Sequence, residues 1–148
     1  MTQILRTALL IAAATLIAAP AAAEHRKVVD GLAINIGVVP ATQLLRIDAY
    51  ERSSHREAAA AATHHVVVGV ADAKTGQPIG DARVTLDLAD PRGGTQSRTL
   101  TRGDAGGFPD YSGLFRFGWS GAYKLRVKVE RAGAAPVGST FTWTQDSY

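Results

Sequence analysis

The side chains with the clearest chemical potential in this sequence are its four histidines. They are His25, His55, His64 and His65. Imidazole is a good ligand for Cu(II) and Zn(II). The sequence contains no cysteine, and its one methionine is Met1. Thiolate and thioether sites are therefore excluded downstream of Met1, and an imidazole site for Cu(II) or Zn(II) is the metal chemistry that the composition leaves open.

Two of these histidines are consecutive, which limits how they can act. His64 and His65 begin an alternating stretch, and successive side chains of a strand point to opposite faces. With Val66 and Val68 directed inward, His64 shares the core-facing side and His65 faces solvent. A metal site would need one of the two, joined by His55. The alternative is that they are ordinary polar residues at the entrance of a strand.

His25 offers a different kind of site, one that depends on how the chain is processed. Cleavage after Ala23 would leave Glu24-His25 at the new terminus, where amine and imidazole chelate Cu(II) weakly. Cleavage after Ala22 would give the spacing of a square-planar Cu(II) or Ni(II) site. That cut would put Pro20 at a position that signal peptidase disfavours.

Catalytic arrangements find little support in the sequence. Ser53-Ser54-His55 lies in a stretch without a rigid frame that could hold a nucleophile and a base together. Asp104 and Asp110 flank a glycine turn but lack the alternating oxygen ligands of a calcium loop. We therefore expect no catalytic residues, no enzymatic activity and no required cofactor.

Aromatic residues gather in the C-terminal third of the chain. Most of them fit alternating, core-facing positions of strands. Phe108, Trp119 and Tyr148 instead fall in turns or at the tail, where aromatic rings favour contact with a partner. These three are the candidates for a protein-binding surface.

The first residues have the pattern of an export signal. Arg6 precedes an apolar run from Ala8 to Ala19, and Ala21-Ala22-Ala23 supplies small residues for cleavage. A membrane-spanning helix would need roughly 20 apolar residues, which is longer than this run. We expect cleavage after Ala23, a periplasmic location and no membrane insertion afterwards.

Charge and composition exclude further classes of function. Loss of Arg6 would lower the formal net charge from +3 to +2, and the basic residues show no stripe with interleaved aromatics. We therefore expect no binding to nucleic acid. The absence of cysteine also means that a hydrophobic core, and no disulfide, must hold the fold.

Short stretches with a two-residue apolar period follow the signal. Period two is typical of strands with one buried face. The predicted strands span residues 31–39, 43–50, 64–72, 82–88, 95–102, 111–117, 122–131 and 137–144. They predict an all-β, immunoglobulin-like antiparallel sandwich of seven or eight strands. The expected organisation is a signal peptide (1–23), an N-terminal strand segment (24–50), a flexible connector (51–63) and the sandwich (64–148).

Two hairpins resemble those of known exported domains. His64 to Val68, with the run from Asp72 to Ile79 (DAKTGQPI) and Asp81 to Val84, is similar to the opening hairpin of periplasmic immunoglobulin-like domains of the YtkA-like and FixH-like kind. Gly113 to Phe117 and Ser120 to Val127 resemble their closing hairpin. The stretch from Gly31 to Ala41 is similar to the start of uncharacterised exported proteobacterial proteins. The resemblance spans about residues 31–131, and some such domains belong to copper-related systems.

Two functions therefore stand as expectations. The first is a periplasmic accessory module that contacts a periplasmic or membrane-bound protein, in metal uptake or respiratory assembly. The second is a small protein that binds Cu(II) or Zn(II) through His25, His55 and His64 or His65. The oligomeric state is not indicated by the sequence.

Overall fold

The computed structural model describes residues 25–41 and 64–146 and shows a β-sandwich in that part of the chain. The predicted all-β, immunoglobulin-like fold is confirmed, with nine strands in the described residues and no helix among its elements. The expected signal peptide, the strand at 43–50 and the connector at 51–63 lie outside the described residues. No helix within the described residues has the length and apolar character needed to cross a bilayer.

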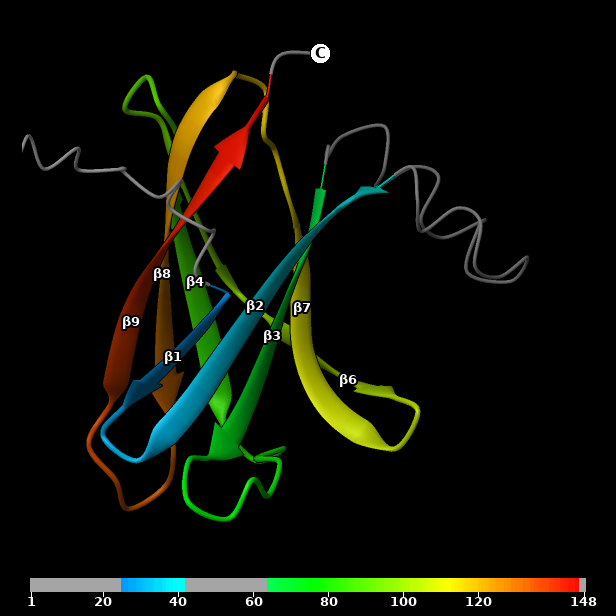
Figure 1. The fold of residues 1–148 in the computed structure, drawn as a ribbon, viewed down its shortest axis with the longest axis vertical. Helices are drawn as coiled ribbons and strands as arrows, with labels where there is room; N and C mark the ends of the chain where they lie inside the picture. The colour runs from blue at the N-terminus through cyan, green and yellow to red at the C-terminus, as the bar shows by residue number, and fades with distance from the viewer. Residues whose placement is uncertain (1–24, 42–63, 147–148) are drawn as a thin grey trace, which may run out of the picture.

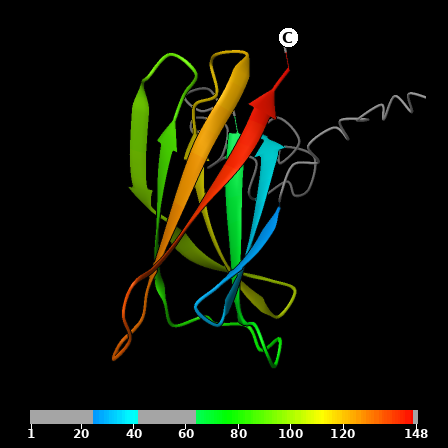
Figure 2. The same cartoon turned by 60° about the vertical axis from the view of Figure 1, so that its left-hand side comes forward.

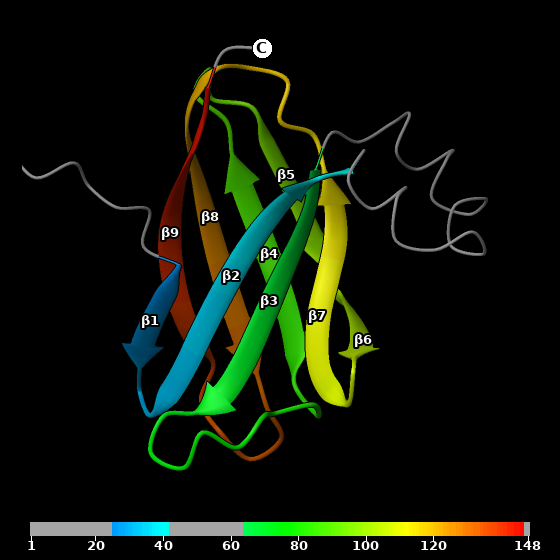
Figure 3. The same cartoon turned by 45° about the vertical axis from the view of Figure 1, so that its right-hand side comes forward.

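The strands form two antiparallel sheets that face each other (Figures 1 and 3). The first, sheet A, has the order β1 (Arg26–Val29), β2 (Leu32–Pro40), β3 (His64–Asp72), β7 (Phe108–Phe115), β6 (Thr101–Ala105). The second, sheet B, has the order β5 (Thr95–Thr99), β4 (Arg83–Ala89), β8 (Gly121–Glu130), β9 (Val137–Gln145). In both sheets neighbouring strands run in opposite directions.

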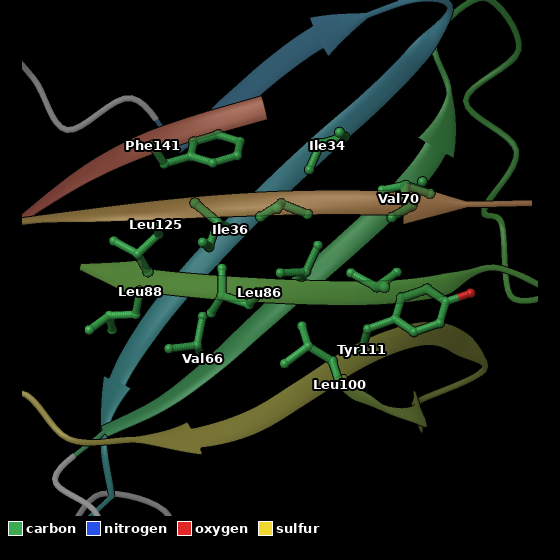
Figure 4. Packing of buried hydrophobic residues seen from close by; sticks show 14 of the residues in the cluster. Ile34, Ile36, Val66, Val70, Leu86, Leu88, Leu100, Tyr111, Leu125 and Phe141 are labelled. Carbon is green, nitrogen blue, oxygen red and sulfur yellow. The ribbon is translucent and has the colours of Figure 1, made fainter. Parts of the chain in front are cut away.

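The core lies between the sheets and is built from alternate residues of each strand. Every second residue of β3 and β8 is buried, as the period-two pattern predicts. Figure 4 shows side chains from both sheets meeting in this layer, among them Ile34 and Val66 from sheet A and Leu86 and Leu125 from sheet B. Burial of apolar surface on this scale is the main stabilising contribution in a fold without disulfides.

The predicted strand at 95–102 is wrong in one respect, because the chain changes sheets inside it. Residues 95–99 form β5 at the edge of sheet B, and residues 101–105 form β6 at the edge of sheet A. Leu100 lies at the crossing point with its side chain in the core, and its N–H donates to the carbonyl of Val84. The polar residues on both sides of Leu100 obscured this switch in the sequence.

The structure also contains a strand that the sequence pattern did not reveal. β1 pairs with β2 through a tight turn at Asp30 and Gly31, whose φ angles are 47° and 77°. An Asp-Gly turn of this kind is a strong hairpin signal. β1 was missed because it has only four residues and leaves Val28 exposed.

The loop after β3 is held by the buried Tyr111. Its hydroxyl donates to the carbonyl of Ile79 and accepts from the N–H of Ala82, both at 3.0 Å. At the start of this loop the Asp72 carboxylate accepts hydrogen bonds from Lys74 and Thr75. These bonds to Thr75 and Lys74 lower the pKa of Asp72. The connection between the sheets is therefore fixed at this end of the sandwich.

Candidate functional site

His64 is the first residue of β3 and lies at the end of the sandwich where β2 ends, which we call the His64 end. The strand register places it between Pro40 of β2 and Phe115 of β7. Only 4% of its surface is exposed. The prediction that His64 shares the core-facing side of β3 is confirmed. The observed strand starts at His64 itself, so both histidines belong to it.

Two aromatic rings, those of Phe117 and Trp143, contact His64, and Tyr123 packs against both of them. We call His64, Phe117, Tyr123 and Trp143 the aromatic cluster. The His64 ring lies 4.7 Å from that of Phe117 and 5.2 Å from that of Trp143, centroid to centroid. Phe117 also contacts Tyr123 at 4.6 Å and Trp143 at 4.8 Å. Tilted and edge-on ring pairs of this kind are favourable beyond the area that they bury.

Hydrogen bonds fix the segment that carries Phe117. The amide of Gln96 on β5 bonds both to the carbonyl and to the N–H of Arg116, at 2.8 and 2.9 Å. The Tyr123 hydroxyl donates to the carbonyl of Trp119 and accepts from its N–H. Phe117 therefore lies in a rigid connection although it belongs to no strand.

Burial lowers the pKa of His64 below its ordinary value. Removing an imidazolium from water disfavours the charged form. The ring is consequently neutral at neutral pH, which is the protonation state that a metal ligand or a core residue requires.

This shift predicts that the metal-free chain becomes less stable as the pH falls below about 6.5. Unfolded His64 titrates near 6.5, whereas the folded-state pKa is lower. Between the two pKa values the unfolded chain binds more protons, so acidification favours unfolding; above 6.5 both states are neutral and no effect remains. Urea unfolding with a chelator present, from about pH 8 to about pH 5, measures this change in the free energy of unfolding. As the pH falls, the wild type should lose free energy of unfolding relative to His64→Gln, which has no imidazole at this position. A difference between the two proteins that does not change over this pH range would contradict the expectation.

His65 points away from the aromatic cluster. It lies opposite Val39 and Leu114 in sheet A and is partly exposed. Because His64 and His65 are on opposite faces of one strand, they do not converge on one ion. The structure thus supports the expectation that only one of them would serve a given metal site.

The described fold does not bring His25 to His64. The carbonyl of His25 accepts from the N–H of Ile36, which pairs with Val68. Val68 is four residues along β3 from His64, a separation of about 13 Å along the strand. His55 lies outside the described residues. Within residues 25–41 and 64–146, no group of three or more His, Cys, Asp or Glu residues is placed to hold a metal ion.

The acidic residues of the β6–β7 hairpin do not form a joint site. Asp104 accepts a hydrogen bond from the N–H of Gly107 and so caps the turn. Asp110 lies opposite Gly103, which is the residue before Asp104 on β6. Because consecutive residues of a strand point to opposite faces, the two carboxylates lie on opposite faces of the hairpin. The interpretation of this segment as an ordinary turn agrees with the geometry.

The candidate partner-binding aromatics lie apart from each other. Phe108 is 66% exposed at the start of β7, on the hairpin that curls outward in Figure 1. Trp119 is 43% exposed and follows the far end of β7, with the guanidinium of Arg92 stacked 3.5 Å from its ring centre. Tyr148 lies outside the described residues. Phe108 and Trp119 therefore do not share one contact surface, and partner binding stays a prediction.

Sequence reasoning missed the companions of His64. The alternating pattern assigned Phe117 and Tyr123 to the core but could not pair them with a histidine more than 50 positions earlier. A detectable signal was present: His64, Tyr123 and Trp143 fall near strand ends, and Phe117 follows the end of β7, so an antiparallel sandwich can bring the four together.

No known protein family matches the sequence, and no curated protein is significantly similar to it. Solved structures share the fold. FetP of uropathogenic Escherichia coli, expressed in the periplasm, superposes with a TM-score of 0.64 at 16% identity, covering 83% of this chain and 93% of FetP. A DUF4426 protein of Pseudomonas aeruginosa gives 0.62 at 18% identity over 81% and 94%. Copper-reconstituted P19 of Campylobacter jejuni gives 0.61 at 15% identity over 80% and 91%.

At identities this low, the similarity shows only that this chain and these proteins share a fold. The YtkA-like and FixH-like resemblance is not confirmed by them. Copper-bound forms are known for FetP as well as for P19.

Proposed function

We propose that this chain is an exported β-sandwich protein that binds Cu(II) or Zn(II) at the His64 end. The observation that carries the proposal is a partly exposed imidazole, that of His65, near the start of the central strand of sheet A, in a fold shared with proteins solved with copper. The export signal in the sequence and the periplasmic expression of FetP support the location. No catalytic step is part of the proposal.

His65 is the better ligand of the two. Its side chain is partly exposed and directed away from the aromatic cluster, whereas the His64 ring is enclosed by Phe117 and Trp143. His64 then acts as a neutral core residue that anchors the first position of β3.

The described residues do not complete a metal site by themselves. They fit a metal as a partial donor set, with one partly exposed imidazole, and they contain no group of three or more His, Cys, Asp or Glu residues placed to hold an ion. The sequence supplies His55 as the second imidazole, nine positions before His64 and outside the described residues. We therefore propose His65 and His55 as the protein's ligands, which favours Cu(II) or Zn(II) over harder cations because imidazole nitrogen suits those ions.

The test is a calorimetric titration of the purified chain with Cu(II) and, separately, with Zn(II). We expect a Kd tighter than about 10 μM for one of them. Loss of even an outer-shell partner weakens metal binding about 10-fold to 100-fold, so His65→Ala and His55→Ala should each weaken it at least about that much.

His25→Ala is the matched control, because it removes an imidazole far along the sheet from His64. It should leave the affinity unchanged. Loss of binding in His25→Ala alone would move the site to the N-terminus and overturn the proposal. So would a Kd weaker than about 10 μM that neither His55→Ala nor His65→Ala alters.

A further inference from the structure

The outer face of sheet B carries a stripe of positive charge that is separate from the His64 end. Lys124, Arg126 and Lys128 alternate along β8 with buried residues, so all three point away from the core. Along a strand, side chains on one face repeat about every 6.6–6.8 Å. β8 is an interior strand of sheet B, which lies toward the viewer in Figure 2, so the stripe runs through the middle of the face.

Small hydroxyl side chains flank this stripe on both sides. Thr142 and Thr140 of β9 lie opposite Lys124 and Arg126. On the other side, Thr85 of β4 lies opposite Lys128. Farther out, Ser97 and Thr99 of β5 extend the hydroxyl border. The large hydrophobic side chains that are exposed in the described residues, Val28, Phe108 and Trp119, all lie elsewhere.

Two of the three cations keep their charge available. Lys128 forms an ion pair with Glu130, at 3.4 Å. The Asp87 carboxylate, although opposite Arg126 in the register, accepts a hydrogen bond from the Ser97 hydroxyl. Among the described residues, Lys124 and Arg126 form no ion pair. Both are free to bind an anion.

The same face is hollowed beside these two cations. A depression of about 410 Å³ is lined by Lys124, Arg126, Asp87, Ser97, Gln96 and Thr140. This volume is in the range of small-ligand sites. Its lining offers two cations, one carboxylate and several hydroxyl and amide groups, together with apolar surface to which Leu88 and Ala89 contribute.

We propose that the outer face of sheet B binds an acidic oligosaccharide. The carboxylates of the sugar bind Arg126 and Lys124, and its hydroxyls bind Asp87, Ser97 and Thr140. A guanidinium matches a carboxylate through two parallel hydrogen bonds. The repeat of cations along β8 suits a ligand whose charges also repeat along a chain.

Two other kinds of partner fit the face less well. A protein interface depends on aromatic or aliphatic anchors at its centre, and no such side chain is exposed on this face. An anionic membrane is bound through clusters of four or more basic residues or through apolar insertion. Here the stripe has three basic residues, one already paired with Glu130, and nothing apolar to insert.

The test is an amide NMR titration of the isotopically labelled chain with trigalacturonate at low salt. We expect a Kd below about 1 mM and shifts centred on β8 and the neighbouring parts of β4, β5 and β9 that line the depression. Arg126→Gln should weaken binding about 10-fold, the effect of losing a charged hydrogen-bond pair. Lys74→Gln makes the same charge change in the turn after β3 and should bind as the wild type does. The thermal unfolding of both variants shows whether they are folded.

Four results would overturn the proposal. The first is equal binding of fully methyl-esterified trigalacturonate, which keeps the hydroxyls and lacks the charge. The second is inorganic phosphate giving the same shifts at the same affinity, because the site would then recognise a simple anion. The third is capture by phosphatidylglycerol vesicles without trigalacturonate binding. The fourth is equal weakening in Lys74→Gln and Arg126→Gln.

Discussion

Replacing Phe117 with alanine is expected to lower the free energy of unfolding by about 3–5 kcal/mol. The ring is fully buried and contacts His64, Tyr123 and Trp143. Its removal would leave a cavity that cannot collapse, because hydrogen bonds from Gln96 and Tyr123 fix the backbone on both sides. Urea unfolding followed by far-ultraviolet circular dichroism measures the change.

Two other substitutions make this result interpretable. Phe108→Ala removes the same ring from a position that is 66% exposed, and it should change stability by less than about 0.5 kcal/mol. Phe117→Leu keeps much of the apolar volume and should cost less than Phe117→Ala. If Phe117→Ala cost no more than Phe108→Ala, the aromatic cluster would not be part of the core.

Replacing Tyr111 with phenylalanine is expected to cost about 2 kcal/mol. The substitution removes one oxygen and leaves the buried ring in place. That oxygen joins the carbonyl of Ile79 and the N–H of Ala82, and both would lose their partner in a part-buried loop between the two sheets. Buried polar groups without a partner lose their hydration and gain nothing in return.

Tyr123→Phe is the matched control for this prediction. It removes the same atom, and the Tyr123 hydroxyl also makes two hydrogen bonds, both to Trp119. Trp119 is 43% exposed, so water can replace the missing hydroxyl there and the cost should stay below about 1 kcal/mol. Equal losses in the two variants would show that the loop anchored by Tyr111 contributes nothing special to stability.

The local pattern of the sequence predicted much of this fold. The strand at 64–72 was placed at its observed bounds, and the strand at 122–131 lies within one residue of β8. Residues 123–130 alternate strictly between apolar and charged side chains, and in 64–72 a valine recurs at positions 66, 68 and 70; both patterns report on burial. The pattern failed at Leu100, where one apolar residue inside a polar run marks a change of sheet, and at β1, which is too short to show a period.

The candidate site was predicted only in part, for a related reason. Alternation along β3 was enough to place His64 inward and His65 outward. It carries no information on what lies across the core, so the contact of His64 with Phe117 and Trp143 was out of reach. The spacing of Lys124, Arg126 and Lys128 was visible in the sequence, but the hydroxyls of β9 beside them depend on strand pairing.

The sequence by itself determined the all-β class, the inward and outward faces of most strands and the absence of sulfur ligands after Met1. These properties are local: they follow from residue types and from a two-residue period that any strand obeys. Only the tertiary structure decided that 95–99 and 101–105 belong to different sheets, that His64 contacts the rings of Phe117 and Trp143, and that hydroxyl side chains border the cations of β8. Those relations depend on the order and register in which distant strands pair, and long-range packing selects them.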